Sequence, residues 1–464
     1  MLIRKQRNRF LIAIITTVAL VVASAACNNG RAPRRSIAPA AAAVVQPPRR
    51  TLAPLPSRPL SPRLQSIRAS AMQDAATVRG LEWKNEVGMT ELSGWEYGTR
   101  TKEVAEVLGG DDLKALSTLA VAGGILPTGT DLATLAVSFT AVTAGATYSP
   151  LDKQVLLLQP DKSDKTRTGD ASRDRSLLTH EFVHALQDQH FDLLRLVLAR
   201  PYNFDRMEAA FALVEGDAMN VQRRQESGEA WARRSLEEIA RQEDERFGVY
   251  RKGIGAFFPP LLTETFIFRY RDGARFVETL RRSRPAFSVD ELFRRPPVSS
   301  EQVLHPEKYL SNETPREIRI DEQALATNGW RMTASTPLGE IGARGLLMAG
   351  MTSPREATRA AAGWGGDRAY VFERGGTGAV PLFIWKTLWD KNEDAQEFFR
   401  AYNALQRRRN LAEVNRATNG AGDQTATLWR EGGVWTHVRL EGDAVLVVRG
   451  AETDIQTALK FAQP

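Results

Sequence analysis

The pentapeptide HEFVH at residues 180–184 constrains this chain more than any other feature. Residues four apart on a helix lie one above the other, so this HExxH pattern must be helical if its two imidazoles are to reach one ion. The surrounding residues, 176–188, contain neither Gly nor Pro and favour a continuous helix. His180 and His184 are therefore candidate metal ligands. Glu181 lies beside them, where it can take a proton from a metal-bound water.

Length and charge limit the classes of protein to consider. A chain of 464 residues with 42% hydrophobic and 25% charged residues is typical of a soluble globular protein with about two domains. The net charge of +7 is confined to one end, because residues 1–70 hold 12 Lys and Arg and no acidic residue. The remainder carries a net charge of −5. The composition therefore gives no support to nucleic-acid binding.

The N-terminal residues predict export. Four basic residues between positions 4 and 9 precede an apolar run at 10–22, which is short for a membrane span but typical of a signal peptide. Small residues at 23–26 lead to Cys27, the single cysteine of the chain. We expect residues 1–26 to be a signal peptide and Cys27 to carry a lipid that anchors the protein to a bacterial membrane. Ordinary cleavage that leaves a free Cys27 thiol is the alternative.

Composition and periodicity divide the rest of the chain and predict an α+β fold. Residues 27–70 are rich in Pro, Ala and Arg and predict an extended tether. Residues 71–335 predict a mainly helical domain with a small edge sheet, in which Gly109-Gly110 interrupts a helix over 102–122. Residues 336–464 alternate between strand and helix patterns and predict a C-terminal α+β domain.

Two residues compete to be the third metal ligand. His190 has the spacing of the HExxHxxGxxH pattern, but Gln187 stands where that pattern needs Gly, so a continuing helix would direct His190 away. Residues 204–224 predict a second helix, with Asp205 and Glu208 as its capping box. Glu215 lies on the apolar face of that helix, and a buried carboxylate needs a partner such as zinc. We therefore favour Glu215 over His190.

Several segments together resemble a known group of enzymes. They are YSP at 148–150, HEFVHALQDQHF at 180–191 and LVEGDA at 213–218, with further likeness at 296–309 and 363–368. They are similar to the gluzincin-type zincins, and more closely to a little-characterised group of predicted secreted bacterial and archaeal zinc metallopeptidases. The likeness spans about residues 75–410.

The resemblance implies roles for further residues. In gluzincins a second helix supplies the Glu ligand, which matches Glu215, and an edge strand before the HExxH helix pairs with the peptide, which matches residues 154–158. A later His or Tyr supports the oxyanion, so His305 and Tyr309 are candidate catalytic residues; a packing role for His305 is equally compatible. The thermolysin-like Asp four residues after the Glu is replaced by Met219.

Two acidic residues, Asp188 and Asp217, could orient a ligand histidine from outside the ligand set, but we favour plain solvated charges for both. Taken together, these features predict an exported zinc-dependent peptidase that acts on proteins or peptides through a zinc-bound water activated by Glu181. The alternative is a membrane-anchored scaffold or binding lipoprotein that keeps the same fold with little or no turnover.

Overall fold

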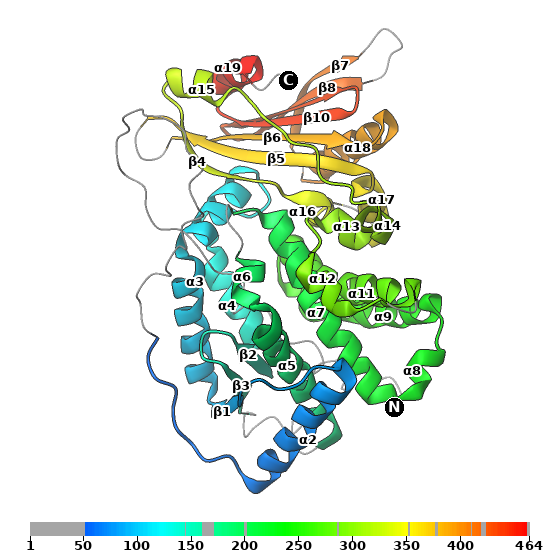
Figure 1. The fold of residues 1–464 in the computed structure, drawn as a ribbon. Coiled ribbons are helices and arrows are strands. Elements are labelled where there is room, and N and C mark those ends of the chain that lie inside the picture. Colours follow the sequence, from blue (N-terminus) through cyan, green and yellow to red (C-terminus); the bar gives the residue numbers. More distant parts are fainter. Residues whose placement is uncertain are drawn as a thin grey trace, which may run out of the picture.

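The chain forms a mainly helical part that carries a small sheet and a second part built on a large sheet (Figure 1). The predicted α+β class is therefore confirmed. The computed structural model describes residues 52–143, 145–159, 171–198, 202–284, 287–350, 353–375, 379–409, 411–418 and 424–461. The predicted signal peptide and Cys27 lie outside these residues. Within them, no helix combines the length and apolar character needed to cross a bilayer.

The helical part extends from α2 to α14 and includes three strands. Its helices are α2 (Pro62–Arg79), α3 (Gly94–Ala122), α4 (Leu132–Thr143), α5 (Ala171–Phe191), α6 (Leu193–Val197), α7 (Phe204–Ser227), α8 (Glu229–Arg233), α9 (Leu236–Lys252), the 3₁₀ helix η1 (Ile254–Phe257), α10 (Pro260–Ile267), the π-helix η2 (Phe268–Asp272), α11 (Gly273–Ser283), α12 (Val289–Arg294), α13 (Ser300–Leu304) and α14 (Pro306–Leu310). Its strands are β1 (Gly88–Leu92), β2 (Ala146–Ser149) and β3 (Gln154–Leu158).

The small sheet corrects the predicted edge strand. Its order is β1-β3-β2, so β3, which contains the predicted residues 154–158, is the central strand. β3 runs parallel to β1 and antiparallel to β2. The edge strand next to α5 is β2, and its four residues are all buried. Strand order depends on tertiary pairing, and the sequence pattern of a short apolar strand does not specify it.

Helices α5 and α7 hold the residues of interest, and a close approach of α11 fixes the position of α7. A Cβ added at Gly216 of α7 would lie 2.2 Å from the carbonyl carbon of Gly273, and one at Gly273 would lie 2.0 Å from the carbonyl oxygen of Ala212. The two helices therefore meet backbone to backbone. Gly216 does not interrupt α7, because the space there admits only a hydrogen atom.

Two helix starts differ from the prediction. Asn203 caps α7 by accepting a hydrogen bond from Arg206 N at 2.9 Å, so the predicted capping box is wrong. Asp205 is instead buried and accepts a hydrogen bond from Ser300 N at 2.9 Å. α2 begins at Pro62, inside the predicted tether, with Ser61 as its N-cap. Pro is well suited to the first position of a helix, so its presence at 62 did not imply an extended chain.

The second part is an antiparallel sheet with helices on both faces. Its strand order is β4-β5-β6-β10-β9-β8-β7. Its elements are α15 (Glu322–Thr327), β4 (Arg331–Thr336), α16 (Gly339–Leu347), α17 (Pro354–Ala361), β5 (Trp364–Glu373), β6 (Leu382–Trp389), α18 (Asn392–Arg408), β7 (Ala412–Thr418), β8 (Gln424–Glu431), β9 (Val434–Glu441), β10 (Ala444–Gly450) and α19 (Glu452–Phe461).

The boundary between the parts lies earlier than predicted. β4 pairs with β5, so the predicted boundary between residues 335 and 336 cuts a strand of the large sheet. The inner face of this sheet joins the main core, in which Trp385 and Val371 share a cluster with Phe211 of α7. The outer face forms a separate cluster, covered by α15 and α19. α3 crosses to the sheet as one helix through Gly109-Gly110, where the sequence predicted a break.

Candidate metal centre

Three side chains from α5 and α7 converge as the sequence predicted. His180 Nε2 lies 3.1 Å from His184 Nε2 and 3.2 Å from Glu215 Oε2, and His184 Nε2 lies 3.4 Å from the same oxygen. The two histidines are four residues apart on α5, and Glu215 reaches them from α7. All three are buried, with 1–3% of each residue exposed. Among the described residues, two groups of His, Cys, Asp or Glu side chains have ligand atoms close enough together to share an ion. This triad is one of the two groups.

The spacing of the three ligand atoms fits a zinc ion. Zn–N and Zn–O bonds of about 2.0–2.2 Å at tetrahedral angles place neighbouring ligand atoms about 3.3–3.6 Å apart. The triangle measured here has sides of 3.1, 3.2 and 3.4 Å, so one side lies within that range and two lie slightly below it. Two imidazoles and one carboxylate also form a donor set that catalytic zinc uses, with a fourth position left for a water or substrate.

The electrostatics of the cluster suit a divalent cation. Burial alone would raise the pKa of Glu215, but the two imidazoles outweigh it and hold this pKa below its usual value. Burial lowers the pKa of His180. For His184, burial is outweighed by the charge of Glu215, which raises its pKa. The negative charge of Glu215 beside the two imidazoles therefore favours a positive charge at this site.

Glu181 lies on the same helix between the two ligand histidines in sequence, and it is fully buried. Its Oε2 accepts a hydrogen bond of 2.8 Å from the backbone N–H of Tyr148 in β2. The edge strand therefore holds the carboxylate of the predicted general base in a fixed orientation. The ring of Tyr270, from η2, stacks on His180 with a centroid distance of 6.1 Å.

Gln187 contacts His184, whereas Asp188 and Asp217, which the sequence favoured as solvated charges, are both buried. His184 Nδ1 lies 2.9 Å from Gln187 Oε1. Gln187 Nε2 donates to Asp217 at 3.0 Å, so its Oε1 is the acceptor and His184 Nδ1 is the donor. This assignment leaves the lone pair of Nε2 directed at the cluster. Asp188 instead accepts a hydrogen bond from the Tyr148 hydroxyl at 2.7 Å.

The support for Gln187 continues through an ion pair. Asp217 accepts from Arg79 Nε at 2.7 Å, and Arg79 also donates to Asp290 at 2.7 Å. Arg79 is the last residue of α2, and Asp290 belongs to α12. Asp217 is thus not a solvated charge, and it contacts Gln187 rather than a ligand histidine. The i, i+3 spacing of His184 and Gln187 was a signal in the sequence that could have identified this pair.

The remaining candidates lie in other contacts. His190 Nε2 is 2.8 Å from the carbonyl oxygen of Glu82, as expected for a residue on a helix that continues past Gln187. His305 Nε2 is 3.1 Å from a carboxylate oxygen of Glu340. The Tyr309 hydroxyl donates to the carbonyl oxygen of Arg295 at 2.8 Å. These contacts give no support to the oxyanion role predicted for His305 and Tyr309.

The comparisons with known proteins concern the large sheet. A family described as "Domain of unknown function (DUF8575)" matches residues 327–460, from just before β4 to near the end of α19. No curated protein and no solved structure matches the chain. The family match begins near the boundary that the strand pairing indicates, and it does not include the three converging ligands.

Proposed function

We propose that this chain is a zinc-dependent peptidase of the gluzincin kind, with His180, His184 and Glu215 as the metal ligands. The observation that carries the proposal is the triangle of ligand atoms with sides of 3.1–3.4 Å, built from an HExxH helix and a second helix. When bound there, zinc polarises a peptide carbonyl and lowers the pKa of an attacking water.

Glu181 is the general base in this proposal. Its carboxylate accepts the proton of the attacking water and passes it to the leaving amine nitrogen. The hydrogen bond from Tyr148 N holds this carboxylate on the side of α5 that faces β2. Gln187 acts through His184, because its amide oxygen fixes the imidazole tautomer that leaves Nε2 unprotonated.

The substrate is a protein or peptide in an extended conformation. β2 is an edge strand, and the N–H of Tyr148 is directed at Glu181 rather than at β3. The outer side of β2 therefore faces the helix that carries the two histidines. A peptide that reaches the cluster would therefore lie beside β2, although the Tyr148 N–H on this side is already bound to Glu181.

The test combines metal content with hydrolysis. In Glu181→Gln, zinc should stay near one per chain while hydrolysis of a denatured-protein panel falls by about 10²- to 10⁴-fold. His190→Ala is the matched control, because it removes an imidazole from the same helix and should change neither value. Unchanged hydrolysis in Glu181→Gln would exclude this mechanism. A wild type that binds zinc but cleaves nothing would favour the membrane-anchored scaffold or binding lipoprotein.

We further propose that the protein is exported and held at the cell envelope by a lipid on Cys27. The supporting features are the basic residues, the apolar run at 10–22 and the small residues before Cys27. Mass spectrometry of the mature N-terminus tests this proposal. An unmodified Cys27 or an N-terminus at Ala26 would exclude the lipid and leave export in place.

A further inference from the structure

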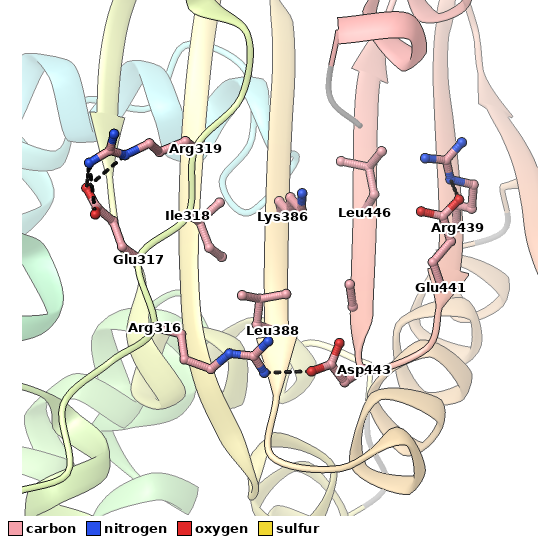
Figure 2. A pocket seen from close by; sticks show the side chains of 11 residues that line it. Arg316, Glu317, Ile318, Arg319, Lys386, Leu388, Arg439, Glu441, Asp443 and Leu446 are labelled. Carbon is pink, nitrogen blue, oxygen red and sulfur yellow. Dashed lines mark hydrogen bonds and ion pairs between the residues drawn. The ribbon is translucent and has the colours of Figure 1, made fainter. Parts of the chain in front are cut away.

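A groove lies on the outer face of the large sheet, where the helical cover ends. α15 and α19 pack on one portion of this face, in a cluster that includes Ile384 and Val448. Further along β6, β10 and β9 the same face borders an open volume of about 500 Å³ (Figure 2). The lining residues are Arg316, Glu317, Ile318, Arg319, Lys386, Leu388, Arg439, Glu441, Asp443, Ala444 and Leu446.

Lys386 lies in the floor of this groove. Its neighbour across the sheet is Leu446 of β10, which in turn pairs with Arg439 of β9, so the three side chains form one row on the outer face. Only 8% of Lys386 is exposed. Among the described residues, the Lys386 ammonium has no hydrogen-bonding or ion-pairing partner. Its burial lowers its pKa.

The other cations of the groove are matched by carboxylates. The three ion pairs are Arg316–Asp443 at 2.6 Å, Arg319–Glu317 at 3.0 Å and Arg439–Glu441 at 2.9 Å. Figure 2 shows Arg316 reaching past Leu388 to Asp443, which brings one pair to an end of the groove. The pairs cancel one another, so the groove has one unmatched positive charge, that of Lys386.

Most of the Lys386 side chain is buried, but its Nζ is not one of the buried polar atoms without a partner, so the ammonium itself reaches the groove. A Met or Leu at position 386 would match its neighbours Leu388 and Leu446, which also line the groove. Within the chain, the charge of Glu441 favours this ammonium, but no described carboxylate forms an ion pair with it. Arg439 has a donor to spare as well, because its Nε lies 2.9 Å from Glu441 without the alignment of a hydrogen bond.

We propose that this groove binds a carboxylate whose adjoining part is aliphatic, with Lys386 as its charge partner. The single unmatched charge fits a monoanion better than a phosphate dianion, because each further negative charge would lie close to Glu441 and Asp443. Leu388, Ala444 and Leu446 offer the aliphatic part an apolar floor. The volume is within the range of small-ligand sites.

A peptide C-terminus with an aliphatic last residue and a free aliphatic acid share this chemistry. The inference does not rest on the proposed peptidase activity, because the groove lies on the face of the sheet opposite the core shared with α7. Loss of binding in the groove and loss of hydrolysis are therefore separate outcomes.

The experiment is calorimetric titration of the purified full chain carrying Glu181→Gln, so that peptide probes are not cleaved. The probes are N-acetyl-Ala-Ala-Leu with a free carboxylate, the same peptide as its C-terminal amide, 4-methylpentanoate and inorganic phosphate. We expect the free-carboxylate peptide to bind, and both the amide and the Lys386→Met substitution to weaken binding by about 10- to 100-fold. Lys386→Arg should retain most of the affinity.

Lys252→Met is the matched control, because it removes an exposed lysine from α9 in the helical part and should leave binding unchanged. Thermal unfolding checks that Lys386→Met is folded. If the peptide and 4-methylpentanoate bind equally, the inference holds and the ligand is a free acid. It is overturned if neither carboxylate binds, if phosphate binds more tightly than both, or if folded Lys386→Met binds as well as the wild type.

Discussion

Two clusters in this protein each bring three ligand groups close together, but they differ in what lies between those groups. In the first, Glu215 of α7 faces two imidazoles of α5. In the second, Glu301, Glu313 and Asp390 surround the ammonium of Lys308 at distances of 2.6, 2.8 and 2.6 Å. The second cluster contains its own cation and ties α13 and α14 to the large sheet. A converging set of carboxylates is therefore a poor guide to metal binding until its neighbours are known.

The first cluster differs in burial as well as in chemistry. Its three members are all buried, whereas Glu313 and Asp390 of the second are exposed. Its imidazoles donate lone pairs that suit zinc, whereas three carboxylates suit harder cations or a lysine. We therefore expect the first cluster, whose His184 is held by Gln187, to bind a metal and the second to remain an ion-pair network.

The largest expected effect separates the two clusters directly. Glu215→Ala should abolish stoichiometric zinc binding, because it removes one of three protein ligands. Glu301→Ala should leave zinc at one per chain, since Lys308 rather than a metal occupies that cluster. Metal analysis after dialysis measures both. Zinc loss in Glu301→Ala with zinc retained in Glu215→Ala would reverse the comparison.

A smaller effect tests the contact that supports the ligand. Gln187→Leu keeps the approximate volume but cannot accept from His184 Nδ1, so zinc affinity should fall by about 10- to 100-fold. Competition with a chelator of known affinity measures the change. Gln189→Leu is the control, because Gln189 is on the same helix and contacts the backbone of Asn85 instead. Equal losses in the two variants would show that Gln187 has no specific role.

The next prediction removes Lys308, the internal cation of the second cluster. Lys308→Met leaves three carboxylates without a partner and should lower the free energy of unfolding by about 2 kcal/mol. Calcium should then stabilise the variant more than the wild type, because the carboxylates have lost their own cation. Thermal unfolding with and without calcium provides the measurement. A Lys308→Met variant as stable as the wild type would show that Lys308 contributes little to the free energy of unfolding.

The smallest effect concerns the N-terminal end of α7. Burial raises the pKa of Asp205 to about 8, so the folded protein binds a proton that the unfolded chain releases near its ordinary pKa of about 3.9. Its contribution to stability is present at low pH and is lost as pH rises towards 8. Asp205→Asn stays neutral and still accepts from Ser300 N.

The variant should therefore lose less stability than the wild type between about pH 6 and 8, by on the order of 1 kcal/mol. Denaturant unfolding at several pH values measures the difference. Because burial also raises the pKa of Glu301 to about 7, the slope should be reduced rather than abolished. An unchanged slope would show that Asp205 is ionised in the folded protein.

The sequence predicted local features well where their cause was local. The HExxH helix and the helix of Glu215 follow from apolar periodicity, and both occur near the expected residues in α5 and α7. The strand and helix patterns predicted over residues 336–464 also correspond to observed elements, such as the strands β6 and β9. β4 was missed, since its Arg331, Thr333 and Ser335 gave it a polar pattern.

Features that depend on tertiary contacts were not predictable in the same way. Which strand of the small sheet lies at its edge follows from the pairing of β3 with β1, a contact between segments more than 60 residues apart. The capping of α7 by Asn203 was missed because Asp205 offered the more familiar capping pattern. In the structure Asp205 is buried and binds Ser300 N instead. His305 was chosen for its proline-bounded segment, and that pattern carried no information about Glu340.

The residues that form and support the candidate metal centre are synthesised at different times. Arg79 and Asp290, which close the chain of contacts behind Gln187, are 211 residues apart in sequence. During synthesis from the N-terminus, His180, His184 and Glu215 all emerge before Asp290. A nascent chain can therefore present all the ligands while the contacts that orient one of them are still incomplete. If the cluster binds a metal as proposed, the full affinity should be reached only after the chain has been made through α12.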